Sequence, residues 1–496
     1  MLIGREQEKA ILSKLLKSEQ AEFMAIYGRR RVGKTFLIRQ FFQEQIAFSF
    51  TGAFEAETSI QLNNFWVELK RVYPNAAFQK SPQNWSQAFQ RLTDYLISIK
   101  ETKSKIVIFI DELPWLDRTG AGFVSALEYF WNQHGSQFNN LIFVSCGSAA
   151  SWMIGKLLKA KGGLHNRVTC RIELKPFSLK ETKEFCEYKN LKFNYYQLTQ
   201  LYMILGGIPY YWQAIEQGRS VAQVVENLCF DNNGILTKEF EYLYHSLFKN
   251  ADNHIKVIEA LASHPYGMTR NQLLAETQIS NGGNFIRVVE NLIDCGFIKS
   301  LKPYGKKNKD TVFRIIDFYS VFYLKYIIGN IGDRSNIWQS LSVTPGYNSW
   351  MGYAFENICL THLRPIHTAL GIRGVFTKVS SFYFKGNDEL PGAQIDIVIE
   401  RNDGIIHLCE AKFTNTEFVL NKEINQALRR KRLVFQEITK TKKMVVTTLF
   451  SSYPAIQNQY YNEDFVKILV VNGVVLCLCF YYHEKSGYEC YTQILI

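Results

Sequence analysis

Short apolar runs alternate with amphipathic segments over the first 177 residues of the chain. Buried strands are predicted at 23–27, 105–110 and 141–146, and a helix is predicted at 36–42. Short β-branched runs alternating with helices are typical of a parallel sheet with helices packed on it. The pattern therefore predicts an α/β domain over residues 1–177.

The pattern changes twice further along the chain. It becomes helical over residues 178–250, where Gly206-Gly207-Ile208-Pro209 breaks two helices. Residues 251–343 then predict three amphipathic helices and a strand pair, which is the order of elements in a winged helix. These helices are expected at 255–262, 270–277 and 284–295, and the strands at 297–302 and 311–316.

The last part of the chain, residues 344–496, opens at Thr344-Pro345-Gly346, which we interpret as a linker. A helix containing Glu356 follows, and the remainder is rich in strands. The chain is thus predicted to be an α/β multidomain protein, with an α/β core, a helical lid, a winged helix and a further α/β domain.

Composition limits the class of protein. The 496 residues are 47% hydrophobic, and 57 Lys+Arg against 45 Asp+Glu give a net charge of +12, which favours a polyanionic partner such as DNA or a nucleotide. Many soluble proteins are as basic, so the charge alone does not decide. The amino terminus lacks the features of a secretion signal, no membrane span is predicted, and the ten cysteines follow no Cys-x-x-Cys pattern. A cytoplasmic location is expected.

A complete phosphate-binding loop lies between the first predicted strand and its helix. It reads Gly28-Arg29-Arg30-Arg31-Val32-Gly33-Lys34-Thr35. Backbone N–H groups of such a loop wrap phosphates, its lysine reaches the β- and γ-phosphates, and its hydroxyl binds Mg²⁺. All eight residues are therefore candidates for binding ATP, and at least one of the three arginines is expected to contact a phosphate or an adjacent acidic surface.

The predicted strand at 105–110 ends in two carboxylates, Asp111 and Glu112. Beside a phosphate-binding loop, Asp111 would hold Mg²⁺, mainly through water, and Glu112 would orient and deprotonate the attacking water. Ser148 follows the next strand, where it senses the γ-phosphate or caps the following helix. Arg167 either supplies positive charge to the phosphoryl group, in this subunit or a neighbouring one of a homo-oligomer, or is a surface arginine.

A second group of charged residues lies near the carboxy terminus. Asp396 belongs to a predicted strand, and Glu410 and Lys412 belong to the next strand after the turn Asn402-Asp403-Gly404. If residues 401 and 405 pair, Asp396 lies opposite Glu410, and Lys412 shares their face. Two carboxylates and a lysine on one face suit metal-assisted phosphodiester cleavage. The alternative is a hairpin with a surface salt bridge.

The first 330 residues resemble a known family in five motifs. These are Ile3-Gly4-Arg5-Glu6, the loop GRRRVGKT, the strand IVIFIDEL, Cys146-Gly147-Ser148 and Gly206-Gly207-Ile208-Pro209-Tyr210. They are similar to the AAA+/STAND-related P-loop ATPases called the archaeal ATPase family. The resemblance implies that the Gly-Arg-Glu start lies by the nucleotide base and that the Gly-Gly-x-Pro turn places the lid over it. Where the family has Tyr-Gly-Arg, this chain has Leu164-His165-Asn166-Arg167, a departure that leaves Arg167 as a candidate only.

The carboxy-terminal group, together with Glu356 on the preceding helix, resembles the PD-(D/E)XK nuclease fold, which the archaeal ATPase family often carries. This resemblance implies that Glu356, Asp396 and Glu410 hold Mg²⁺. We therefore expect an ATPase that controls a DNA nuclease domain. The alternative is a STAND-like ATP-driven signalling switch whose last domain is a catalytically silent binding module. The winged helix either binds DNA or only couples the other domains.

Overall fold

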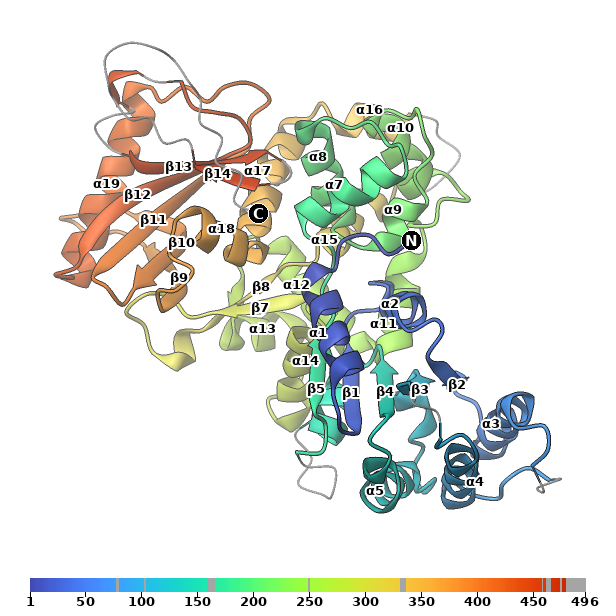
Figure 1. The fold of residues 1–496 in the computed structure, drawn as a ribbon. Coiled ribbons are helices and arrows are strands. Elements are labelled where there is room, and N and C mark those ends of the chain that lie inside the picture. The colour runs from blue at the N-terminus through green and yellow to red at the C-terminus, as the bar shows by residue number, and fades with distance from the viewer. Residues whose placement is uncertain are drawn as a thin grey trace, which may run out of the picture. The chain divides into compact units, whose positions relative to one another are not determined.

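The computed structural model describes residues 1–76, 80–101, 104–158, 166–248, 250–330, 336–456, 458–460, 465–472 and 475–478. They form two compact units, whose elements are labelled in Figure 1. Unit 1 comprises Met1–Pro176 and Leu247–Lys249, and unit 2 comprises Phe177–Ser246 and Asn250–Ile496.

Unit 1 is built on a five-stranded sheet in which every pair of neighbouring strands is parallel, in the order β2-β3-β4-β1-β5. The three predicted strands are confirmed as β1, β3 and β4. The strands are β1 (Glu22–Tyr27), β2 (Ile46–Thr51), β3 (Ile106–Asp111), β4 (Leu141–Gly147) and β5 (Cys170–Glu173). The α-helices are α1 (Glu6–Lys17), α2 (Lys34–Phe41), α3 (Thr58–Val72), α4 (Trp85–Ser98), α5 (Phe123–Gln133) and α6 (Ala150–Trp152). The 3₁₀ helices η1 (Leu113–Leu116) and η2 (Gly135–Gln137) and the π-helix η3 (Met153–Leu158) also belong to this unit.

The buried sheet of unit 1 determines where the predicted site residues lie. Strands β3 and β4 are buried along their whole length, and aromatic rings such as Phe23, Trp131 and Phe143 pack against one another on the sheet. In a parallel sheet the carboxyl ends of all strands meet at one edge. The phosphate-binding loop after β1, Asp111 at the end of β3 and Ser148 after β4 therefore lie at the same edge.

Unit 2 begins with a helical segment, as the pattern predicts. It contains α7 (Leu179–Tyr188), α8 (Tyr195–Leu205), α9 (Pro209–Gln213), α10 (Val221–Val225), η4 (Glu226–Phe230) and α11 (Glu239–Leu247). The predicted break is also present, because Gly206 has a left-handed φ of 60° after α8 and Pro209 opens α9. A Cβ on Gly207 would collide with the carbonyl oxygen of Phe177, so this turn requires glycine.

The middle of unit 2 has the three predicted helices and the strand pair. The elements are α12 (Asp252–Ser263), β6 (Met268–Thr269), α13 (Arg270–Thr277), α14 (Gly283–Asp294), β7 (Ile298–Leu301), η5 (Asn308–Asp310) and β8 (Val312–Ile315). The strands form an antiparallel sheet in the order β6-β8-β7. Three further helical stretches follow, α15 (Phe318–Phe322), η6 (Tyr323–Ile327) and α16 (Ile337–Leu341).

The predicted linker at Thr344-Pro345-Gly346 is wrong. These residues begin the long helix α17 (Pro345–Thr361), and the Thr344 hydroxyl accepts a hydrogen bond from the Tyr347 N–H. A hydroxyl residue followed by proline is also a helix-start signal, because proline lacks the N–H that the first turn leaves unpaired. The same residues therefore start an element instead of separating two.

The carboxy-terminal part of unit 2 carries a six-stranded mixed sheet in the order β14-β13-β12-β11-β10-β9. Strands β11, β12 and β13 are parallel, whereas the outer neighbours on each side pair antiparallel. Helix α19, which joins β11 to β12, packs Val434 and Phe435 on the sheet. The elements are α18 (Leu363–Ala369), β9 (Thr377–Phe384), β10 (Ala393–Arg401), β11 (Ile405–Lys412), α19 (Lys422–Thr439), β12 (Met444–Ser451), β13 (Phe465–Asn472) and β14 (Val475–Leu478).

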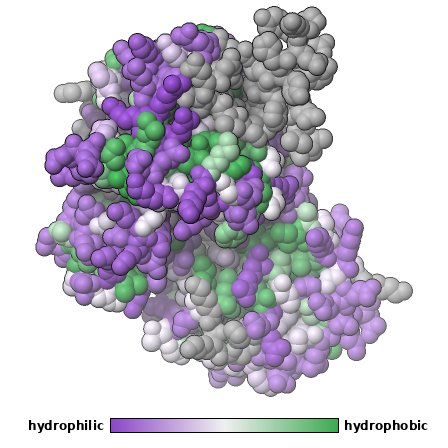
Figure 2. All heavy atoms as spheres, turned by 90° about the vertical axis from the view of Figure 1, so that its left-hand side faces the viewer, coloured by the Kyte–Doolittle hydropathy of each residue, from purple (hydrophilic) through white to green (hydrophobic). Residues whose placement is uncertain are grey.

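The face of the chain drawn in Figure 2 is covered mainly by hydrophilic residues, with hydrophobic residues in separate groups between them. Among the described residues, no helix combines the length and the apolar character needed to cross a bilayer.

Candidate functional site

The phosphate-binding loop connects β1 to α2 in a conformation that its glycines permit. Gly28 has a φ of 140°, and a Cβ there would collide with the Leu174 carbonyl oxygen. Gly33, with a φ of 91°, precedes α2, and no side chain caps the first turn of that helix. The N–H groups of this turn therefore point to the position at which a helix amino terminus receives phosphate.

Lys34 lies inside the loop. Its side chain is buried, and its Nζ donates to the carbonyl oxygens of Gly28 at 2.9 Å and Arg29 at 3.0 Å. A buried ammonium needs oxygen partners to offset its lost hydration. The two carbonyls hold the Lys34 ammonium against the loop backbone. Its contact with the phosphates of a nucleotide stays a prediction.

The hydroxyl and the carboxylate predicted to hold Mg²⁺ are in contact. Thr35 Oγ1 donates to Asp111 Oδ2 at 2.6 Å, and the other oxygen of Asp111 accepts from the Glu112 N–H at 2.9 Å. A hydroxyl and a carboxylate beside phosphate oxygens are the ligand types that Mg²⁺ prefers. The loop, Lys34, Thr35 and Asp111 therefore fit a nucleotide triphosphate with its magnesium ion.

Glu112 and Ser148 form a pair that the sequence did not reveal. Glu112 has a left-handed φ of 48°, and its Oε2 accepts from the Ser148 Oγ at 2.8 Å and from the Ser148 N–H at 3.1 Å. Ser148 does not cap the next helix, because Ala149 is its N-cap residue and no side chain accepts a cap bond. The helix-cap alternative is therefore wrong. The signal for the pair was that both residues follow adjacent strands.

Arg5 makes contacts with the phosphate-binding loop and with the segment after β5 that were not predicted from the sequence. Its buried guanidinium donates from Nη2 to Val32 O at 3.0 Å and from Nη1 to Lys175 O at 2.7 Å. Val32 belongs to the phosphate-binding loop, and Lys175 follows β5. Arg5 thus connects the amino-terminal segment to the phosphate-binding loop and restrains the loop backbone at Val32.

The remaining arginines differ in exposure. Arg29 is buried, Arg30 and Arg31 are half-buried, and Arg167 is exposed. His165 lies outside the described residues. The roles of these arginines toward phosphate stay predictions.

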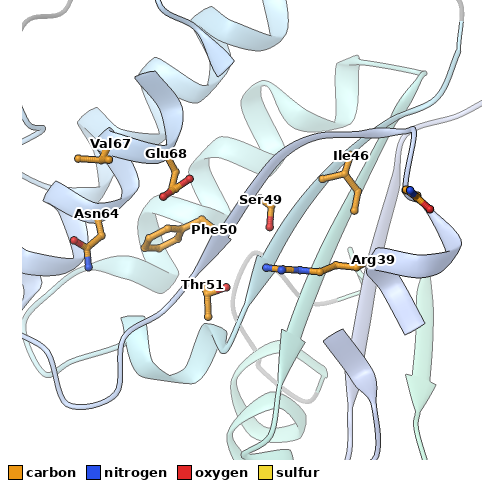
Figure 3. Close-up of a pocket in the computed structure, with 9 residues that line it drawn as sticks. Arg39, Ile46, Ser49, Phe50, Thr51, Asn64, Val67 and Glu68 are labelled. Atoms are coloured by element: carbon orange, nitrogen blue, oxygen red, sulfur yellow. The ribbon is translucent and has the colours of Figure 1, made fainter. Parts of the chain in front are cut away.

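A pocket of about 690 Å³ lies beside the edge strand β2 (Figure 3). Arg39 of α2 and Glu68 of α3 project into it from opposite sides, and Ser49 and Thr51 line its floor. None of the eight residues of the phosphate-binding loop lines it. This pocket is therefore distinct from the predicted nucleotide site.

The register inferred for the carboxy-terminal hairpin is confirmed. Ile397 pairs with Cys409 and Glu400 with Ile406, so the same register sets Asp396 opposite Glu410. Glu410 lies between two lysines, with Lys412 Nζ at 2.9 Å from Oε1 and Lys431 Nζ, on α19, at 2.9 Å from Oε2. Burial raises the pKa of Glu410, but the charges of Lys431 and Lys412 outweigh it and leave the pKa below the usual value.

Arg314 is the residue of this region that sequence reasoning missed. It lies on β8 of the middle segment, which runs from α12 to β8 (residues 252–315). Its side chain is 3% exposed, with Nη2 at 3.0 Å from Glu356 Oε2 and Nη1 at 3.8 Å from Asp396 Oδ1. Burial and the neighbouring Asp396 charge raise the pKa of Glu356 to about 7, and both outweigh the ion pair with Arg314. No local pattern could link these residues, because Arg314 lies far from Glu356 and Asp396 in the sequence.

The predicted metal site of Glu356, Asp396 and Glu410 is not formed in this arrangement. Within the ranges that the structure describes, no three Asp, Glu, His or Cys side chains are grouped closely enough to hold a metal ion. Each carboxylate faces a cationic side chain instead, because Arg314 contacts Glu356 and Asp396 while two lysines contact Glu410. As arranged, these residues do not fit Mg²⁺, and we derive no step through it.

The chain is similar to known proteins over most of its length. An uncharacterised protein of Methanocaldococcus jannaschii is 26% identical over 443 residues, which are 87% of this chain and 92% of that protein. The Walker-type ATPase of Pyrococcus abyssi is 16% identical, with a TM-score of 0.48, over 65% of this chain and 96% of that one. The ORC2 protein of Aeropyrum pernix is 15% identical, with a TM-score of 0.42, over 69% of this chain and 96% of that one.

Two family models match separate parts of the chain. Residues 2–215 match the model of an ATPase domain predominantly from Archaea. Residues 320–427 match the model of archaeal and bacterial proteins of unknown function. Residues 2–215 are therefore similar to an ATPase domain found predominantly in Archaea, and residues 320–427 are similar to archaeal and bacterial proteins of unknown function.

Proposed function

We propose that unit 1 binds ATP with Mg²⁺ and hydrolyses it, and that the nucleotide state controls unit 2. The observation that carries the proposal is the contact of Thr35 Oγ1 with Asp111 Oδ2 at 2.6 Å, directly after the loop that holds Lys34. Lys34 orients and neutralises the phosphates, and Mg²⁺, when bound, neutralises charge that develops on the transferring phosphoryl group. Thr35 and Asp111 are the residues that hold the ion.

Glu112 is the proposed base for the attacking water. Its carboxylate is hydrogen-bonded by Ser148, so its position depends on the residue that follows β4. A γ-phosphate that attracts the Ser148 hydroxyl would free one acceptor of Glu112 for water. Ser148 would then link phosphate sensing to water activation, and Arg167 would add charge from this copy or from a neighbour in a homo-oligomer.

Unit 2 is proposed to contact DNA through a winged helix. The turn between β7 and β8 presents the exposed side chains of Lys306, Lys307 and Lys309, and α14 presents Asn284 and Arg287. Exposed cations on a hairpin turn suit contacts to phosphates. The net charge of +12 supports a polyanionic partner. Free thiols, all buried except the half-buried Cys170, support the proposed cytoplasmic location; they are Cys146, Cys170, Cys186, Cys229, Cys295, Cys359 and Cys409.

Replacement of Lys306, Lys307 and Lys309 by Ala is expected to weaken DNA binding and to reduce its salt dependence. Each lost phosphate contact should lower the slope of log K against log salt by about 0.9. Fluorescence anisotropy of a labelled duplex at several salt concentrations measures both quantities. The control is Lys14→Ala with Lys17→Ala, two exposed lysines of α1. If affinity and slope stay at wild-type values, the middle segment only couples the other parts.

Two contacts of Tyr304 favour a coupling role, which is compatible with DNA binding. The Tyr304 N–H donates to Ser381 O of β9 at 2.7 Å, and its ring packs on Phe435 of α19 with 5.0 Å between centroids. The base of the turn is therefore attached to the carboxy-terminal sheet. A movement of the middle segment would be transmitted to that sheet.

The carboxy-terminal sheet is proposed to have the PD-(D/E)XK nuclease fold. The support is the register that sets Asp396 opposite Glu410, with Lys412 bound to Glu410. The ion pairs of all three carboxylates favour the second candidate function, in which this domain is a catalytically silent module of an ATP-driven signalling switch.

A DNA cleavage assay with Mg²⁺ or Mn²⁺, with and without ATP, distinguishes the two functions. A nuclease predicts cutting that Asp396→Ala and Glu410→Ala each abolish, while ATP hydrolysis continues because its residues belong to unit 1. The control is Glu417→Ala, an exposed carboxylate outside the group. Wild-type protein that cuts DNA under none of these conditions supports the silent module.

A further inference from the structure

The buried guanidinium of Arg314 faces two carboxylates, and a third lies nearby. Glu356 and Asp396 are its ion-pair partners, at 3.0 and 3.8 Å, and Glu410 is close enough for its charge to act on Glu356. Glu410 is itself paired with Lys412 and Lys431. Three cationic side chains thus face three carboxylates. The one that contacts both Glu356 and Asp396 is Arg314, which lies on β8 of the middle segment.

The backbone around Arg314 fixes the guanidinium in place. Strand β8 is the central strand of its sheet, and Arg314 pairs there with Lys299 of β7. On the next residue of β8, the Ile315 carbonyl accepts from Asn357 Nδ2 at 3.1 Å, and Asn357 follows Glu356 on α17. The strand and the helix are therefore connected one residue away from the ion pair. This connection restricts the position of the Arg314 side chain between Glu356 and Asp396.

Arg314 is held by charge more than by a complete set of hydrogen bonds. Its Nε is buried and has no acceptor among the residues that the structure describes. A structural arginine in a protein interior normally pairs its N–H groups, since an unpaired buried donor is costly. Carboxylate oxygens are also the ligands that a divalent ion such as Mg²⁺ prefers. Two carboxylates that share one incompletely hydrogen-bonded cation therefore resemble the ligands of such an ion.

We propose that Arg314 is an internal counter-cation that occupies the position of a divalent metal ion between Glu356 and Asp396, and that it thereby keeps the carboxy-terminal site closed. This inference rests on the proposed nuclease fold of the carboxy-terminal sheet. Loss of the Arg314 charge would leave Glu356 and Asp396 without their shared counter-cation, and the two carboxylates could then bind Mn²⁺ in its place.

The test measures Mn²⁺ binding to the full chain without nucleotide. The electron paramagnetic resonance signal of free Mn²⁺ reports how much of the ion remains unbound. Arg314→Gln removes the charge, and we expect its Mn²⁺ affinity to exceed that of wild type by at least about tenfold, a gain that Asp396→Asn in the same chain abolishes. Arg314→Lys keeps a cation and should bind as weakly as wild type. Arg373→Gln, an exposed arginine of the same part of the chain, is the matched control.

Equal Mn²⁺ affinity of folded Arg314→Gln and wild type overturns the proposal. If Arg314→Gln unfolds, added Mn²⁺ should restore its thermal transition, because the ion replaces the lost charge; a chain that Mn²⁺ does not rescue also overturns it. The readout is independent of cutting. Arg314→Gln that gains Mn²⁺ but never cuts DNA supports this inference and contradicts the nuclease, whereas wild-type protein that binds Mn²⁺ tightly and cuts supports the nuclease and contradicts this inference.

Discussion

Glu112→Gln is expected to lower the turnover number for ATP hydrolysis by about 100-fold or more while ATP affinity changes little. General-base catalysis contributes roughly 10²–10⁴-fold to the rate of such reactions. Glutamine keeps an oxygen that accepts the hydrogen bonds from Ser148, which Glu112 now receives at 2.8 and 3.1 Å, but it cannot take a proton from water. The loss should therefore fall on turnover and leave binding intact.

Steady-state phosphate release gives the turnover number of this variant, and titration with a fluorescent ATP analogue gives its affinity. The control is Glu44→Gln, an exposed carboxylate of unit 1 that has no proposed role. A normal turnover number for Glu112→Gln would show that another group activates the water.

Lys34→Ala is expected to weaken ATP binding by about 30-fold or more. A hydrogen bond from a charged group is worth about 1.5–3 kcal/mol, and about 2 kcal/mol corresponds to that factor. The ammonium already lies inside the loop, bound to Gly28 O and Arg29 O, so little reorganisation is needed to meet phosphates. Its removal deletes the charge without a substitute.

The same titration measures the effect, with Lys17→Ala, an exposed lysine of α1, as the control. Circular dichroism of Lys34→Ala separates lost binding from an unfolded loop region. An affinity equal to that of wild type would mean that phosphates do not enter this loop.

Features set by neighbouring residues could be predicted from the sequence. The strands β1, β3 and β4 follow from apolar runs, and the pairing of β10 with β11 follows from the Asn402-Asp403-Gly404 turn, which fixes the register. The break after α8 follows from its glycines and proline. In each case the signal and the structure lie within a few residues of each other.

Features set by distant residues could not be predicted. The Glu112–Ser148 pair joins two strand ends, and Arg314 reaches Glu356 and Asp396 from another sheet. The register that sets Asp396 opposite Glu410 could be predicted. Arg314 and Lys431, which neutralise the carboxylates, come from elements whose packing the sequence does not encode locally. Thr344 was misread because hydroxyl residues and proline mark both linkers and helix starts.

Unit 1 is proposed to bind ATP with Mg²⁺ in its phosphate-binding loop and to hydrolyse it. Phosphate release from ATP by the purified full chain, with Mg²⁺ and after its chelation, tests it most directly. We expect the wild type to release phosphate with Mg²⁺ and to stop when Mg²⁺ is chelated. Release should be lost in a chain that carries both Thr35→Ala and Asp111→Ala, which remove the two proposed ion-binding residues, whose oxygens are 2.6 Å apart. Release that persists in that chain at the wild-type rate, or wild-type protein that releases no phosphate, would contradict it.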